Sequence, residues 1–180
     1  GGTGFVVNER GYAVTNDHVV DDCDVVAGKQ GERKMYVAVV AHDPVADLAI
    51  IKTCEEFLSP AFFRKRGARL RPGEDVYAFG FGLSDMTSSQ PKITDGVISA
   101  LPSPKEWMKY EANCIQTQTP INPGNSGGPL LDSGGRLIGV NTTIISGSRS
   151  NSGVGFAIPV NTVNRVVAQL IRFGKVKRPA

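Results

Sequence analysis

Short apolar runs separated by turn-forming residues recur along this 180-residue chain, and they constrain its fold more than any other feature. Runs of about four to eight residues that are rich in β-branched side chains and bounded by glycine, proline, asparagine or aspartate are typical of a sandwich or barrel. The 21 glycines and 11 prolines supply the many turns that such a fold needs. We therefore expect an all-β protein with few helices.

The expected strands fall into two groups on either side of the irregular stretch 80–91. The first group, a six-stranded antiparallel barrel, comprises residues 4–8, 12–15, 23–27, 35–41, 48–52 and 75–79. The second barrel comprises residues 92–101, 112–118, 128–131, 137–143 and 155–159. We place the division at residue 85, so that the barrels 1–85 and 86–180 together form one domain.

Two tight turns and one terminal helix complete the expected elements. Residues 8–11 (Asn-Glu-Arg-Gly) and 132–135 (Asp-Ser-Gly-Gly) have the composition of hairpin turns. Residues 160–173 carry valine, leucine and isoleucine at helical spacing, with Asn161 as the expected N-cap and Gly174 as the expected stop.

Charge and cysteine content exclude several classes of protein. The formal charge of +3 is small, and the basic stretches 64–71 and 175–178 lack interleaved aromatic residues, so we interpret them as solvated surface and expect no nucleic acid. The three cysteines exclude a dense disulfide framework, although a bridge between Cys23 and Cys54 stays open, and Cys114 lies in an apolar run that predicts burial.

The sequence predicts neither a membrane span nor a targeting leader. No window reaches a length of about 18 apolar residues, which a membrane span needs. Gly1 opens directly into strand-like sequence without a targeting leader.

A serine between glycines is the strongest local signal for chemistry, in the run Asn-Pro-Gly-Asn-Ser-Gly-Gly-Pro-Leu of residues 122–130. Glycines allow backbone angles that expose a serine hydroxyl and let neighbouring N–H groups point into one concavity where an oxyanion can form. We expect an oxyanion hole in the segment Gly124, Asn125 and Ser126, with the N–H groups of Gly124 and Ser126 as donors. An ordinary glycine-rich turn with an idle serine gives the same pattern, so other residues must decide.

The order of the histidines restricts how Ser126 can be activated. His18 and His42 both precede Ser126, which excludes the α/β-hydrolase order of serine, acid and histidine and favours the chymotrypsin order of histidine, aspartate and serine. His18 follows a predicted strand, whereas His42 stands beside Asp43-Pro44 and is interpreted as a surface residue. Asp47 opens the apolar run 48–51, where its carboxylate can be buried.

Four blocks of sequence together resemble the HtrA, or Deg, family of serine proteases. They are TNDHVV at 15–20, DPVADLAII at 43–51, GNSGGPL at 124–130 and GFAIP at 155–159, and KITDGVISAL at 92–101 extends the likeness. The resemblance implies a serine endopeptidase with His18 as base, Asp47 as the acid that orients it and Ser126 as nucleophile, in the cleft between two six-stranded barrels.

The resemblance also implies partners and a setting. It suggests unfolded or extended polypeptide substrates, protein quality control in the cell envelope or periplasm or in an organelle, homotrimers, and a PDZ domain after the tail 174–179. The chain departs from the family in the segment 116–121 before the nucleophile loop and in a long loop at 80–91, and it lacks a long insertion between its early strands.

Substrate preference is expected to depend on the stretch before Ser126, on Asn141, Thr142 and Thr143, and on the loop 146–153. These stretches contain no carboxylate, so we expect cleavage after small or medium aliphatic residues rather than after lysine or arginine. No metal-ligand cluster or phosphate-binding loop is recognised, so no cofactor is expected. A non-catalytic relative that binds peptides along strand edges, or a latent enzyme that needs a partner domain, stays open as an alternative.

Overall fold

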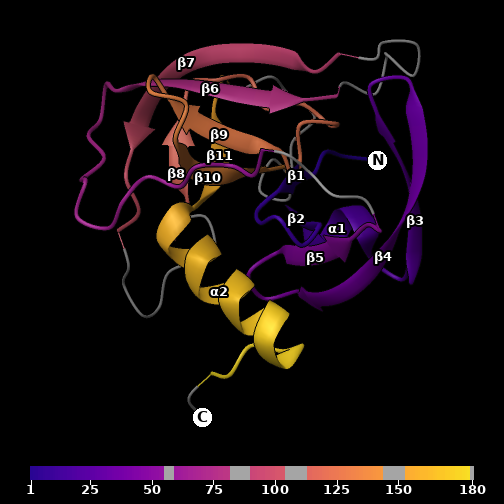
Figure 1. The fold of residues 1–180 in the computed structure, drawn as a ribbon. Coiled ribbons are helices and arrows are strands. Elements are labelled where there is room, and N and C mark those ends of the chain that lie inside the picture. The colour runs from indigo at the N-terminus through magenta and orange to yellow at the C-terminus, as the bar shows by residue number, and fades with distance from the viewer. Residues whose placement is uncertain (55–58, 82–89, 104–112, 144–152, 179–180) are drawn as a thin grey trace.

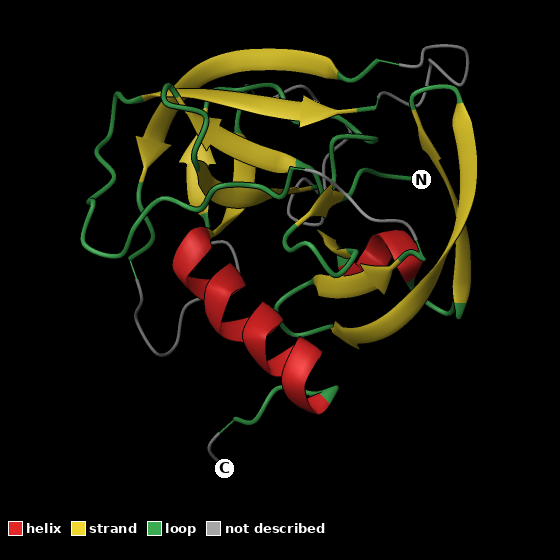
Figure 2. Ribbon diagram, in the orientation of Figure 1, coloured by secondary structure: helices red, strands yellow, loops and turns green. Residues whose placement is uncertain are grey.

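The computed structural model describes residues 1–54, 59–81, 90–103, 113–143 and 153–178 (Figure 1). This part of the chain contains two helices. Strands predominate over them, as Figure 2 shows. In chain order the elements are β1 (Phe5–Val6), β2 (Tyr12–Thr15), α1 (Asp17–Val20), β3 (Val25–Gln30), β4 (Arg33–Asp43), β5 (Leu48–Lys52), β6 (Asp75–Gly80), β7 (Lys92–Ala100), β8 (Ile115–Thr117), β9 (Pro129–Asp132), β10 (Leu137–Thr142), β11 (Gly155–Pro159) and α2 (Val160–Phe173).

The strands form two antiparallel sheets, one open and one closed. The first sheet has five strands in the order β1-β2-β5-β4-β3, and the second is a closed barrel in the order β10-β11-β8-β7-β6-β9. The expected chymotrypsin-like architecture of two β bodies with a C-terminal helix is confirmed. The expectation of six strands in the first body is wrong, because β6 pairs with β7 and β9 in the second barrel. The expected division at residue 85 lies in 82–89, outside the described residues.

Alternating burial explains why the first sheet forms where it does. Along β4, Val37, Ala41 and Asp43 are buried, while Tyr36 and His42 face outward. This period of two places one face of the strand on the core and the other in solvent. The next strand, β5, begins with three fully buried residues, Leu48–Ile50, and pairs with both β2 and β4. β5 is therefore a central strand, and the residue that precedes it is held at the edge of the core.

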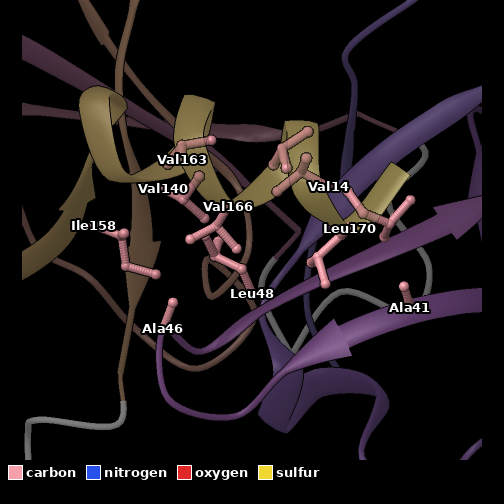
Figure 3. Close-up of a cluster of buried hydrophobic side chains, with 11 residues drawn as sticks. Val14, Ala41, Ala46, Leu48, Val140, Ile158, Val163, Val166 and Leu170 are labelled. Carbon is pink, nitrogen blue, oxygen red and sulfur yellow. The ribbon is translucent and has the colours of Figure 1, made fainter. Parts of the chain in front are cut away.

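Helix α2 packs against both sheets and completes the main core (Figure 3). Val163, Val166 and Leu170 lie on its inner face and contact Leu48 of the first sheet and Val140 of the second. Burying each such side chain stabilises the fold by about 1.5–3 kcal/mol. The helix therefore fixes the first sheet relative to the second.

The ends of α2 test two expectations. Gly174 ends the helix as expected, with a left-handed φ of 69° and its N–H bonded to the Leu170 carbonyl at 2.9 Å. The expected N-cap, Asn161, is wrong: the cap position is Pro159, and Asn161 lies inside the first turn. The fixed φ of proline suits this junction, because β11 continues into α2 without a loop.

The segment between β5 and β6 also joins the two sheets. Ala61 donates its N–H to the Val6 carbonyl at 2.9 Å, and Leu137 donates to the Phe62 carbonyl at 2.6 Å. The Arg64 guanidinium donates to Glu74 at 2.6 Å and to Asp132 at 3.4 Å. The hydrogen bond from Arg64 lowers the pKa of the Glu74 carboxyl. These contacts tie the connecting segment to both bodies.

The cysteines follow the sequence expectation in part. Cys114 is buried, as predicted. Cys23 and Cys54, both among the described residues, are exposed and are not joined by a disulfide. In the ranges that the structure describes, neither helix has the length and apolar character to cross a membrane.

Candidate active site

The ring of His18 is paired with the carboxylate of Asp47. His18 Nδ1 lies 2.9 Å from Asp47 Oδ1 and 3.0 Å from Oδ2, and the backbone N–H of His18 donates to Oδ1 at 3.1 Å. The His18 side chain keeps 30% of its surface exposed, whereas that of Asp47 keeps 2%. A carboxylate on Nδ1 holds that nitrogen protonated and leaves Nε2 as the acceptor. The pair therefore presents a basic nitrogen at the edge of the first sheet.

Asp47 is fixed by contacts on both its backbone and its carboxylate. Its φ of 52° lies in the left-handed region, in the turn between β4 and β5. Asn16 Nδ2 donates to its carbonyl at 2.9 Å, and Thr142 Oγ1 donates to its Oδ2 at 2.8 Å. Because Thr142 belongs to β10, the acid of the first sheet is held in part by the second barrel.

The turn that carries Asp47 is itself anchored. Asp43, which is buried, accepts a hydrogen bond from the Ala46 N–H at 3.2 Å. Arg178 from the tail binds the same carboxylate with both terminal nitrogens, at 2.9 and 2.5 Å. Bidentate pairing of this kind adds geometric specificity as well as energy. The sequence analysis interprets residues 175–178 as solvated surface. Arg178 has a further role, because its guanidinium binds the buried carboxylate of Asp43.

Ser126 lies in the loop between β8 and β9 of the second barrel. It is 2% exposed, and its Oγ lies 2.6 Å from Thr143 Oγ1. Among the described residues Ser126 Oγ bonds Thr143 and not the His18 ring. Thr143 follows Thr142, which contacts Asp47. Two neighbouring threonines therefore contact Asp47 and Ser126.

The loop that carries Ser126, residues 118–128, is called the nucleophile loop after the expected role of Ser126, and several of its backbone groups are already hydrogen-bonded. Asn125 donates its N–H to Asn122 at 2.9 Å, and Gly127 donates to Asn141 at 2.9 Å. In the described part of the chain no acceptor is found for the N–H groups of Gly124 and Ser126. The expected donors are thus unengaged, whereas the N–H of Asn125 is already used within the turn.

Close packing explains the glycine after Ser126. Gly127 has a φ of 83°, and a Cβ built on it would lie 2.3 Å from the Thr3 carbonyl oxygen and 2.4 Å from Thr15 Oγ1. No side chain fits this position without displacing the backbone. The nucleophile loop therefore rests directly on the strand that leads to His18.

The residues expected to line the substrate pocket have different surroundings. Asn141 is fully buried, and its Nδ2 donates to the Pro129 carbonyl at 3.2 Å. Thr142 is also buried, against Asp47, and Thr143 is half-buried beside Ser126. The expected pocket residues in 146–152 lie outside the described residues.

Two features of the site escaped the sequence analysis. The sequence predicts only that His18 follows a strand, whereas the residue lies in the short helix α1, whose four residues are too few to show a helical period. Asp17 also forms a second histidine–aspartate pair, with its Oδ1 2.6 Å from Nδ1 of His42. His42 is half-exposed at the end of β4, so it is a surface histidine with a fixed partner. The pairing joins residues 25 apart in sequence, and no local signal reports it.

The two β bodies, with a histidine–aspartate pair on one and a serine in a glycine-rich loop on the other, define the chymotrypsin-like class of folds. The family model described as the trypsin-like peptidase domain matches residues 2–140 of the sequence. The chain belongs to this family.

Deg and HtrA proteases are among the relatives that match, which confirms the expected resemblance. A probable periplasmic serine endoprotease DegP-like from Chlamydia pneumoniae is 44% identical over 98% of this chain and 36% of the relative. The chloroplastic protease Do-like 1 of Arabidopsis thaliana is 44% identical over 99% of this chain and 41% of the relative. Among solved structures, the HtrA-type protease AlgW with a tripeptide superposes with a TM-score of 0.83 at 35% identity, over 97% of this chain and 57% of that one. This chain thus spans between a third and three fifths of the length of these proteins.

Proposed function

We propose that this chain is a serine endopeptidase in which Ser126, His18 and Asp47 form the catalytic triad. The observation that carries the proposal is the pairing of the partly exposed His18 ring with the buried Asp47 carboxylate, with Nδ1 within 3.0 Å of both carboxylate oxygens. The relative from Chlamydia pneumoniae named above supports it, since that protein is described as a probable serine endoprotease. A triad needs such a pair, because the aspartate holds the tautomer that lets the imidazole accept a proton.

In the proposed reaction, Ser126 attacks the peptide carbonyl and His18 accepts its proton on Nε2. The Ser126 hydroxyl first exchanges its bond to Thr143 for one to His18, which requires a rotation of the serine side chain. His18 then donates the proton to the leaving amine, and water hydrolyses the acyl-enzyme. Asp47 stabilises the imidazolium throughout, and its burial strengthens that interaction.

The oxyanion of the tetrahedral intermediate is assigned to the N–H groups of Gly124 and Ser126. Both belong to the nucleophile loop and have no other acceptor among the described residues. A single donor of this kind contributes about 100- to 1,000-fold to kcat in related chemistry. No group of three or more potential metal ligands is present in the described ranges, and the proposed steps use only this chain's own residues.

The proposed substrates are unfolded or extended polypeptides, cut after small or medium aliphatic residues. The described stretch before Ser126 and the end of β10 contain no carboxylate to pair with lysine or arginine. In a library of fluorogenic peptides, kcat/KM for valine or alanine before the cut bond is expected to exceed that for lysine by about tenfold or more. A preference for lysine or arginine would contradict this assignment.

The proposed setting and partners follow the relatives. Periplasmic and chloroplastic proteases are among them, so an envelope or organelle location is proposed for this protein as well. Homotrimers and a PDZ domain are proposed on the family resemblance. A role in protein quality control fits substrates that have lost their fold.

The proposed function is tested by incubating the protein with unfolded casein and with a fluorophosphonate probe, beside Ser126→Ala as the control. The wild type is expected to degrade casein and to bind the probe covalently, and the variant to do neither. Labelling in Ser126→Ala would place the nucleophile elsewhere. Loss of casein in both proteins would reveal a contaminating protease.

The bond between Ser126 and Thr143 favours a second candidate, an enzyme that is latent until a partner domain or oligomer contact acts on it. Thr143→Val removes that bond while keeping the shape of the side chain. A latent enzyme is expected to gain probe labelling in this variant, whereas a constitutively competent enzyme is expected to label no faster than the wild type.

A further inference from the structure

Thr3 lies beneath the nucleophile loop and bonds to it at two points. Its backbone N–H donates to the Ser126 carbonyl at 2.8 Å, and its hydroxyl donates to the Gly124 carbonyl at 2.6 Å. Thr3 is 7% exposed, so these bonds are shielded from water. We propose that Thr3 is a positioning residue that orients the nucleophile loop for catalysis, an inference that rests on the proposed function.

The bonds of Thr3 complete the fixation of three successive peptide planes. The plane between Gly124 and Asn125 is held by Thr3 at its carbonyl and by Asn122 at its N–H. In the plane between Ser126 and Gly127, the carbonyl accepts the Thr3 N–H and the N–H donates to the Asn141 carbonyl. Between them, the Asn125 carbonyl accepts the Gly128 N–H at 2.9 Å. Because the C=O and N–H of a trans peptide point in opposite directions, this arrangement fixes the direction of the Ser126 N–H.

Thr3 also links the loop to the strand that leads to His18. Thr15, at the end of β2, donates its hydroxyl to the Thr3 carbonyl at 2.8 Å. The path from Ser126 through Thr3 to Thr15 therefore crosses from the second barrel to the first with one residue between. Through this path Thr3 sets the position of the nucleophile relative to its base.

The Thr3 hydroxyl has a second partner, which explains why a hydroxyl is needed. Phe81, which follows β6, donates its N–H to Thr3 Oγ1 at 3.0 Å. The hydroxyl thus acts as donor to Gly124 and as acceptor from Phe81 at the same time. An apolar side chain of the same shape would take the Thr3 partner away from the buried Gly124 carbonyl and from the partly buried Phe81 N–H.

The test compares Thr3→Val, Thr3→Ser and Thr3→Cys with a control, Thr53→Val. Thr53 is also a buried threonine, but it follows β5 beside Gly11, at the end of the strand opposite Asp47. The measurements are kcat and KM for a fluorogenic peptide, corrected by active-site titration, and the inhibition constant of a peptidyl boronate. The boronate forms a tetrahedral adduct on serine, whose oxygen occupies the oxyanion position.

Thr3→Val is expected to lower kcat by about 100-fold with KM unchanged, as for the loss of one oxyanion donor, and to weaken the boronate by the same factor. Thr3→Ser, which keeps the hydroxyl, is expected to restore both, and Thr53→Val to match the wild type. Should Thr3→Val not fold, Thr3→Cys carries the test, because a thiol is a weak donor and gives a smaller loss of the same kind.

A purely structural role would give a different result. In that case Thr3→Val or Thr3→Cys would lower the melting temperature while the titrated enzyme kept its kcat and its affinity for the boronate, and the proposal would be overturned. Equal losses in Thr3→Ser and Thr3→Val would overturn it too. An inactive wild type would refute the proposed function instead. In that case hydrogen exchange would still test whether Thr3 holds the nucleophile loop, because the amides of Asn125 and Gly127 are expected to exchange faster in Thr3→Val than in Thr3→Ser.

Discussion

Replacing His18 by alanine is expected to lower kcat for peptide hydrolysis by about a million-fold, the scale on which triads lose activity when the base is removed. Without the imidazole, nothing accepts the Ser126 proton, since the only other histidine, His42, is engaged with Asp17. Steady-state hydrolysis of a fluorogenic peptide measures the loss. Peptide binding, measured separately by fluorescence anisotropy, is expected to stay close to that of the wild type.

The matched control for His18→Ala is His42→Ala. His42 also has Nδ1 paired with an aspartate, at 2.6 Å from Asp17, and its side chain is more exposed than that of His18. The control is expected to retain turnover of the same order as the wild type. A large loss of kcat in His42→Ala together with activity in His18→Ala would reverse the assignment of the base.

Replacing Asp47 by asparagine is expected to lower kcat by about 10,000-fold, as in triads whose orienting acid is lost. The shape of the side chain is kept, but its amide donates toward Nδ1 and holds the imidazole in the tautomer that carries its proton on Nε2. That nitrogen can no longer accept the Ser126 proton. Probe labelling and kcat measured on the same sample give the size of the effect.

Asp17→Asn is the control for Asp47→Asn, because it changes the acid of the second histidine–aspartate pair in the same way. Its turnover is expected to stay of the same order as that of the wild type. The melting temperature of each variant separates a catalytic loss from a loss of fold. If both variants lost activity equally, Asp47 would have no special role in orienting His18.

The sequence predicted most strands because their patterns are local. Strands β2, β5 and β11 and helix α2 begin and end at the predicted residues. The assignment of β6 to the first barrel was wrong because residues 75–79 carry no signal for which neighbours they pair with. That choice depends on the long-range partners β7 and β9. The helix α1 was missed because four residues are too few to show a helical period.

The candidate site was predictable to different degrees. The choice of His18 and Ser126 followed from motif and chain order, and the choice of Asp47 from its place before a buried run. The contacts that fix these residues were not predictable, because they join distant segments. Thr142 lies 95 residues from Asp47, and Thr3 lies 121 residues from Gly124.

By itself the sequence determined the all-β class, the terminal helix and the candidates for the reacting groups. These depend on local periodicity, on the placement of glycines and on the order of residues along the chain. Only the tertiary structure decided that the first sheet is open, that Asp43 binds Arg178, and that Thr3 holds the nucleophile loop. The physical reason is that a hydrogen bond forms where packing brings donor and acceptor within about 3 Å. Which segments packing brings together depends on the whole chain.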